Sequence, residues 1–148
     1  MAVNQEGGFT PMNKSGVSYF ILLLFACQPS MDQSPIPNVP VDIEVNLNDI
    51  DNTPLQLIGG YIYLDGGVRG IILRRETQTI YRAFDRNCTF QPTDACAIVE
   101  VHSSGFYIED TCCQSVFDLS GFPTGGPATF PLKEYQISIV DDRLFITN

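Results

Sequence analysis

Hydrophobic and polar residues alternate along much of this chain in the manner of β-strands. From Val41 to Leu47 the odd-numbered positions are apolar and the even-numbered ones are polar, which predicts one buried and one solvent-facing side. Asp65-Gly66-Gly67 and Asp141-Asp142 are typical of hairpin turns. Further strand-like runs are expected at 56–64, 68–74, 79–84, 97–102, 105–109, 135–140 and 144–147.

Helical periodicity is not sustained in any window, so we expect little helix. Many short strands separated by Gly, Pro and Asp turns favour a β-sandwich or a small barrel. The length of 148 residues suits one domain and a targeting segment. The pattern therefore predicts an all-β protein with one folded domain.

A short apolar segment near the N-terminus, residues 17–27, reads V-S-Y-F-I-L-L-L-F-A-C. It is shorter than the roughly 20 apolar residues of a membrane-spanning helix. With Lys14 before it, the segment has the features of a signal peptide. Leu24-Phe25-Ala26-Cys27 resembles a lipobox, in which Cys27 receives the lipid, although Phe25 replaces the usual small residue.

These features divide the chain into three predicted parts: a lipoprotein signal peptide at 1–27, a flexible tether at 28–40 and a domain at 41–148. Met12 would give a more conventional start of translation than Met1. Gln28 follows the lipidated cysteine, and the absence of Asp there resembles outer-membrane lipoproteins. We therefore expect a bacterial envelope protein that its lipid anchors in a bilayer, most simply the outer membrane.

The charge of the chain argues against one class of partner. Acidic residues number 17 against 8 basic ones, which gives a formal net charge of −9. Binding to nucleic acid requires cations that replace the counterions of the phosphates. We therefore expect no nucleic-acid partner.

Five cysteines are present, and lipidation of Cys27 would leave four. An even number in an oxidising compartment suggests disulfides, and four cysteines permit three pairings. A bridge between the adjacent Cys112 and Cys113 would be strained. Two pairings therefore stay open: Cys96–Cys112 with Cys88–Cys113, or Cys88–Cys112 with Cys96–Cys113.

Three segments of the chain resemble parts of a Rieske iron–sulfur domain. The segment 82–90, R-A-F-D-R-N-C-T-F, is similar to the approach to the first cluster loop, which carries C-x-H. The segment 112–118, C-C-Q-S-V-F-D, is similar to the second loop, C-x-C-H-G-S-x-F-D. Gly126-Pro127-Ala128 resembles the proline-containing loop. The resemblance covers 41–148 and implies a Rieske-like antiparallel β-sandwich with a small subdomain formed by the former cluster loops.

The same resemblance implies that the cluster ligands are lost. A Rieske cluster needs two cysteines on one iron and two histidines on the other. Cys88 matches the first cysteine, but Phe90, Asp110 and Cys113 stand at the three other ligand positions. The sequence has one histidine, His102, so two imidazole ligands are impossible. We predict no cofactor and no metal. The alternatives are an atypical [2Fe–2S] centre, or zinc or iron at Cys88, Asp110 and Cys113.

The resemblance also bears on the disulfides. Some Rieske domains link their two cluster loops by a disulfide, and Cys96 and Cys112 match those positions. Such a bridge closes a loop of about 15 residues, for which chain-entropy estimates give about 3 kcal/mol of stabilisation. Cys88 and Cys113 would then face each other, and we hypothesise that they form a second disulfide.

These interpretations favour a non-catalytic protein, a membrane-tethered accessory or binding subunit of an envelope complex. His102 has no recognisable nucleophile and orienting partner, and the adjacent cysteines do not form the C-x-x-C of thiol oxidoreductases. The expected contact surface surrounds Phe90 and the Gly126-Pro127-Ala128 loop, because in cluster-bearing relatives that tip meets the redox partner. The alternative functions are electron transfer through an atypical centre and thiol–disulfide exchange.

Overall fold

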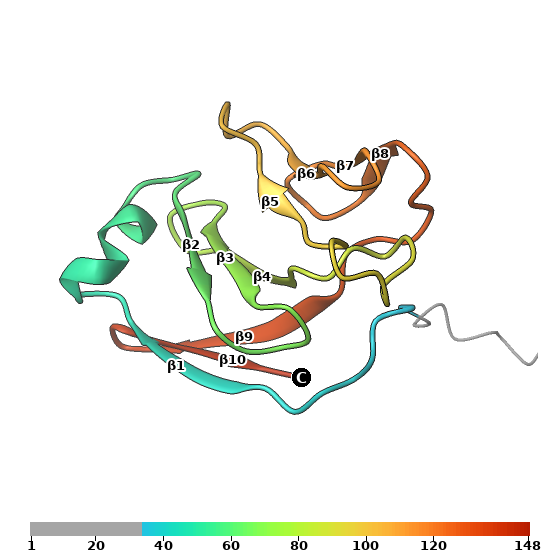
Figure 1. Cartoon of the computed structure of the whole chain (residues 1–148). Helices are drawn as coiled ribbons and strands as arrows, with labels where there is room; N and C mark the ends of the chain where they lie inside the picture. Colours follow the sequence, from blue (N-terminus) through green and yellow to red (C-terminus); the bar gives the residue numbers. More distant parts are fainter. Residues whose placement is uncertain (1–33) are drawn as a thin grey trace, which may run out of the picture. The chain divides into compact units, whose positions relative to one another are not determined.

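The computed structural model describes residues 34–148, which form two antiparallel β-sheets (Figure 1). The six-stranded sheet has the order β1-β10-β9-β4-β3-β2, and the four-stranded sheet has the order β5-β6-β7-β8. A 3-10 helix, η1 (Ile50–Gln56), lies between β1 and β2 in sequence. The strands of the larger sheet are β1 (Asp42–Asn46), β2 (Tyr61–Leu64), β3 (Ile71–Arg75), β4 (Tyr81–Asp85), β9 (Glu134–Val140) and β10 (Arg143–Thr147). Those of the smaller sheet are β5 (Glu100–Val101), β6 (Ile108–Asp110), β7 (Ser115–Phe117) and β8 (Pro123–Gly125).

The predicted all-β class and the small second subdomain are confirmed. The smaller sheet arises from the segment between β4 and β9, which holds both of the loops that carry cysteines. Both predicted hairpins form, β2 with β3 and β9 with β10. Within the described residues, η1 is the one helical element, which agrees with the low helix content expected.

The strand expected at 56–64 begins later than predicted, because its first part is helix and turn. Asp49 caps η1 by accepting the backbone N–H of Asp51, and Pro54 lies inside the helix. Leu55 is buried, whereas Leu57 is 71% exposed. The apolar run that suggested a strand is therefore split between a local cap, a buried helix residue and an exposed turn.

The larger sheet curls around its own hydrophobic core. Val45 of β1 and Ile62 of β2 belong to the two edge strands, yet both contact the same cluster of buried side chains. The alternation of β3 explains how the sheet serves two cores, since Ile71 and Leu73 enter this cluster while Ile72 faces the other way. The remaining buried members are Val41, Leu55, Ala83, Tyr135, Leu144 and Ile146.

A second core joins the two sheets. Ile72 and Phe84 extend from the outer side of β3 and β4 into contact with buried residues of the smaller subdomain. Cys88 is one of these residues, and Phe90 and Cys113 pack against the cluster from partly buried positions. The other buried members are Ala97, Val99, Val101, Ile108, Phe117, Ala128 and Leu132. The two loops that carry the cysteines are thus anchored by apolar packing.

The last residues of the predicted tether, 36–40, lie against the domain. Ile36 is buried, and the Nζ of Lys133 donates to the carbonyl of Pro37 (2.8 Å) and to Asn38 Oδ1 (2.9 Å). The side-chain amide of Asn148 donates to the same Asn38 oxygen at 2.8 Å. These bonds fix a segment that composition alone assigned to a tether.

The predicted signal peptide, including Cys27, lies outside the described residues. Among the residues that the structure describes, no helix has the length and apolar character needed to cross a membrane.

Candidate functional site

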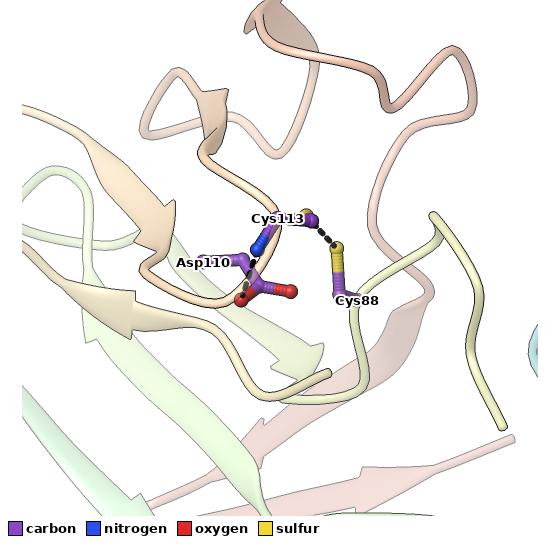
Figure 2. A group of neighbouring side chains, drawn as sticks. All are labelled: Cys88, Asp110 and Cys113. Carbon is purple, nitrogen blue, oxygen red and sulfur yellow. Dashed lines mark hydrogen bonds between the residues drawn. The ribbon is translucent and has the colours of Figure 1, made fainter. Parts of the chain in front are cut away.

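Two loops of the smaller subdomain bring the sequence-predicted residues together. Cys88 follows β4 in the first loop, and Asp110 ends β6 at the start of the second, which continues through Cys113 to β7. Figure 2 shows the side chains of Cys88, Asp110 and Cys113 facing one another. One atom of each, two sulfurs and a carboxylate oxygen, lies within 4.8 Å of the others.

A disulfide links the two loops near this group. Cys96 of the first loop is bonded to Cys112 of the second, with Cα atoms 5.8 Å apart, an ordinary separation for a disulfide. This is the pairing that the family resemblance implies. Both cysteines are exposed, so the bridge lies at the surface, whereas Cys88 is buried in the core.

The structure does not contain the second disulfide that we predicted. The Sγ atoms of Cys88 and Cys113 are 3.7 Å apart, whereas a disulfide requires about 2.05 Å, and both residues are free thiols. Cys113 Sγ instead lies 3.0 Å from Ser115 Oγ, to which its thiol donates. This contact holds the Cys113 sulfur at hydrogen-bonding distance from Cys88.

Asp110 provides the buried carboxyl group of the site, with only 1% of its surface exposed. Its Oδ1 accepts the backbone N–H of Cys112 at 2.7 Å and that of Cys113 at 3.4 Å. Within residues 34–148, Oδ2 has no hydrogen-bond partner although it is buried. A buried carboxylate oxygen without a partner is costly, and such atoms are rare in folded proteins.

The electrostatics of the site keep Cys88 protonated. Burial raises the pKa of the Cys88 thiol far above its usual range, and the neighbouring Asp110 carboxylate raises it further. Cys113 is half-buried, so the two sulfurs differ in access to solvent. The protonated Cys88 thiol differs from the activated thiolate of a redox enzyme.

Ser115 organises the site from β7. Its buried hydroxyl accepts the backbone N–H of Ala128 (3.1 Å) in addition to the Cys113 thiol. Gly126 permits this approach, because it has φ of +79° and a Cβ there would lie 2.3 Å from the carbonyl oxygen of Gln114. Ser115 thus links two loops.

Phe90 lies beside the cysteines of the site, whereas His102 lies outside it. Phe90 is partly buried and packs against the core beside the cysteines. His102 lies just beyond β5, where its ring stacks on Tyr107 with centroids 4.2 Å apart and its Nδ1 lies 2.8 Å from Ser104 Oγ. The backbone N–H of Ser104 also points to this nitrogen. His102 is thus part of a turn and is absent from the site.

The residues present do not fit a Rieske cluster. The site offers three ligand atoms, and none of them belongs to His102. Cys96 and Cys112 are bonded to each other in a disulfide and cannot act as ligands. A [2Fe–2S] cluster needs four ligands, two of them imidazoles in the Rieske type. No electron-transfer step through such a cluster can be derived from this arrangement.

No family model matches the chain, and no curated protein matches it. Among solved structures, the chain is similar to the ferredoxin of carbazole 1,9a-dioxygenase from Nocardioides aromaticivorans IC177. The sequence identity is 17% and the TM-score 0.46, and the match covers 74% of this chain and 97% of that chain.

Proposed function

We propose that this protein is a lipid-anchored component of a bacterial envelope, in which a Rieske-like domain without cluster ligands serves as a non-catalytic accessory or binding subunit. The observation that carries the proposal is the content of the former cluster site. Two loops with the sequence features of Rieske cluster loops are linked by a disulfide, yet Phe90 stands at a histidine position and His102 lies elsewhere. The scaffold is kept and the redox ligands are replaced.

The end of the smaller subdomain supports a binding role. Phe130 is 49% exposed, and its carbonyl accepts the Thr89 hydroxyl at 2.7 Å, so it lies beside the loop that carries Phe90. Pro127 and Phe130 are exposed on the loop that follows Gly126. Apolar side chains at a surface tip are suited to protein contact. With a net charge of −9 on the chain, the expected partner presents an apolar patch with basic residues around it.

The anchor places this tip in the envelope. Lipidation of Cys27 at the end of the signal peptide would hold the domain at a bilayer, and the intervening residues set its reach. A single acyl chain binds membranes only reversibly, whereas several chains on one cysteine give stable anchoring. The outer membrane is the proposed location.

Crosslinking in intact cells tests the binding role. A photoreactive residue at position 130 is expected to capture one defined envelope protein, because the tip would be in contact with it. The same probe at Phe106, which is 80% exposed on the turn between β5 and β6, is the matched control. Equal products from both positions, or none from position 130, would refute the contact surface.

The anchor is tested separately with Cys27→Ser. The wild-type protein is expected in the membrane fraction with the mass of its lipid, and the variant in the soluble fraction or as an unprocessed precursor. A wild-type chain without lipid would exclude the anchoring mechanism while leaving the contact surface to be judged by the crosslinks.

A further inference from the structure

Cys88, Asp110 and Cys113 form a compact set of metal-ligating atoms that neither the fold nor the proposed function explains. The two sulfurs are 3.7 Å apart, and all three ligand atoms lie within 4.8 Å of one another. We propose that this site binds one divalent, thiophilic metal ion, and that zinc is the cation it fits best. The proposal does not depend on the binding role or on the lipid anchor.

The distance between the two sulfurs is the first argument. Zinc–thiolate bonds are about 2.3 Å long, so two thiolates at a tetrahedral zinc are about 3.8 Å apart. The observed 3.7 Å agrees with this value and is far from the length of a disulfide. The sulfurs are therefore spaced for a shared cation without rearrangement of either loop.

Asp110 provides the second argument, which is independent of the sulfurs. Oδ1 is held by two backbone N–H groups, and these orient the carboxylate. Oδ2 is buried and has no partner among the residues that the structure describes, and a cation at the centre of the group would supply one. Two thiolates and a carboxylate are a ligand set that zinc accepts, with a fourth position left for water.

The surroundings suit the metal-bound form. Ser115 Oγ accepts the Ala128 N–H, so its own proton is free to donate to the Cys113 sulfur once that sulfur is a thiolate. Such hydrogen bonds to ligands typically raise metal affinity about 10–100-fold. A cavity of about 350 Å³ borders Asp110, Cys113 and Phe90, which leaves space for a water ligand.

Zinc binding to this site requires no oxidant. Zinc displaces one proton from the Cys88 thiol and one from the Cys113 thiol, and both protons pass to solvent. Two thiolates and one carboxylate then carry a charge of −3 against +2 on the zinc. The Ser115 hydroxyl and the two N–H groups on Asp110 oppose the remaining charge. The Cys96–Cys112 disulfide takes no part and keeps the two loops together.

The test is metal analysis of the full-length chain, exported and purified without chelator or reductant. About one zinc ion per chain is expected, together with two cysteines that become alkylated only after a chelator removes the metal. Cobalt substituted for zinc is expected to give thiolate-to-metal charge-transfer absorption. That spectrum reports the ligands directly and does not depend on any activity.

Substitutions distinguish the proposed metal ligands from residues that only lie near them. Cys113→Ser is expected to abolish zinc binding, and Ser115→Ala to weaken it about 10–100-fold. Asp110→Asn keeps an oxygen that can accept the two N–H groups, so it is expected to fold while losing at least about tenfold in affinity. Glu109→Gln is the control, because it removes the same charge from the adjacent position, whose side chain points to the opposite face of β6.

Four results would overturn the proposal. The first is a chain with a Cys88–Cys113 disulfide and no metal. The second is a chain with free thiols that takes up no zinc or cobalt in titration. The third is a chain that contains iron and sulfide with visible absorption. Zinc retained equally by Cys113→Ser and the Glu109→Gln control would also exclude this ligand set.

Discussion

Tyr135 and Asp85 form a buried pair that joins three segments of the larger sheet. The Tyr135 hydroxyl donates to Asp85 Oδ2 at 2.7 Å, and the backbone N–H of Val68 donates to the same oxygen at 2.6 Å. Tyr135 lies on β9, Asp85 ends β4, and Val68 belongs to the turn between β2 and β3. Gly67 completes the arrangement, because a Cβ there would lie 2.5 Å from the Asp85 carboxylate.

Removal of the Tyr135 hydroxyl is predicted to destabilise the domain. Tyr135→Phe keeps the buried ring but removes one hydrogen bond from a buried carboxylate, which typically costs about 1.5–3 kcal/mol. Urea denaturation measures the difference in free energy of unfolding. Tyr81→Phe is the control, since no hydrogen bond of the Tyr81 hydroxyl is found in the described part of the chain. An equal loss in the two variants would contradict the assigned role.

The same pair predicts a pH dependence at the alkaline end. Burial raises the pKa of Tyr135 above its usual value of about 10, and the hydrogen bond to Asp85 raises it further. The folded state therefore keeps this proton at pH values where the unfolded chain releases it. The contribution of the neutral Tyr135 to stability is complete below about pH 10 and is lost as the pH rises toward the folded pKa.

The measurement compares how the free energy of unfolding changes with pH in wild type and in Tyr135→Phe, between about pH 9 and about pH 11. Above about pH 10, the stability of the wild type is expected to fall more steeply, by at most about 1.4 kcal/mol per pH unit. The difference between the two proteins isolates this one group from the other tyrosines. Parallel curves would show that the pKa of Tyr135 is the same in both states.

The disulfide between the loops carries a separate prediction. Cys96 and Cys112 are 16 residues apart, and opening a loop of that size is expected to lower the free energy of unfolding by about 3 kcal/mol. The double variant Cys96→Ala with Cys112→Ala, measured in urea, tests this value. A matched control is Thr111→Ala, which alters the exposed position beside Cys112 and leaves the disulfide intact. A loss below about 1 kcal/mol would show that packing alone holds the loops.

The sequence predicted the parts of the fold that follow from regular alternation. Val45 and Ile43 of β1 occupy the inner side, as the pattern at 41–47 indicates. The pattern was misleading where apolar residues are exposed, as at Leu57, because a capped 3-10 helix overrides it. The strands β7 and β8 have three residues each, too few for alternation to be recognised.

The sequence identified the residues of the candidate site but did not predict its chemistry. The family resemblance selected Cys88, Asp110 and Cys113 as positions of interest. The unpaired Oδ2 of Asp110 and the separation of the two sulfurs depend on how two loops distant in sequence pack on Ile72 and Phe84. Tertiary geometry of this kind leaves no local pattern. The predicted Cys88–Cys113 disulfide followed from the family resemblance, which implies that the two cysteines face each other but does not give the distance between their sulfurs.

Gly126 is predicted to be required for the approach of its loop to Ser115. Gly126→Ala places a Cβ 2.3 Å from the carbonyl oxygen of Gln114 and strains a backbone with φ of +79°. A residue forced into this conformation costs about 1–3 kcal/mol, and the clash with backbone atoms cannot be relieved by a side-chain rotation. Gly125→Ala is a close control, because a Cβ at the preceding position meets Val116 at an ordinary 3.7 Å. Urea denaturation is expected to show the loss in Gly126→Ala alone.

The variant should also alkylate faster at Cys113, since the Ser115 hydroxyl that holds this thiol would lose its bond from Ala128. Equal stability and equal alkylation in the two variants would show that the loop does not need the left-handed glycine.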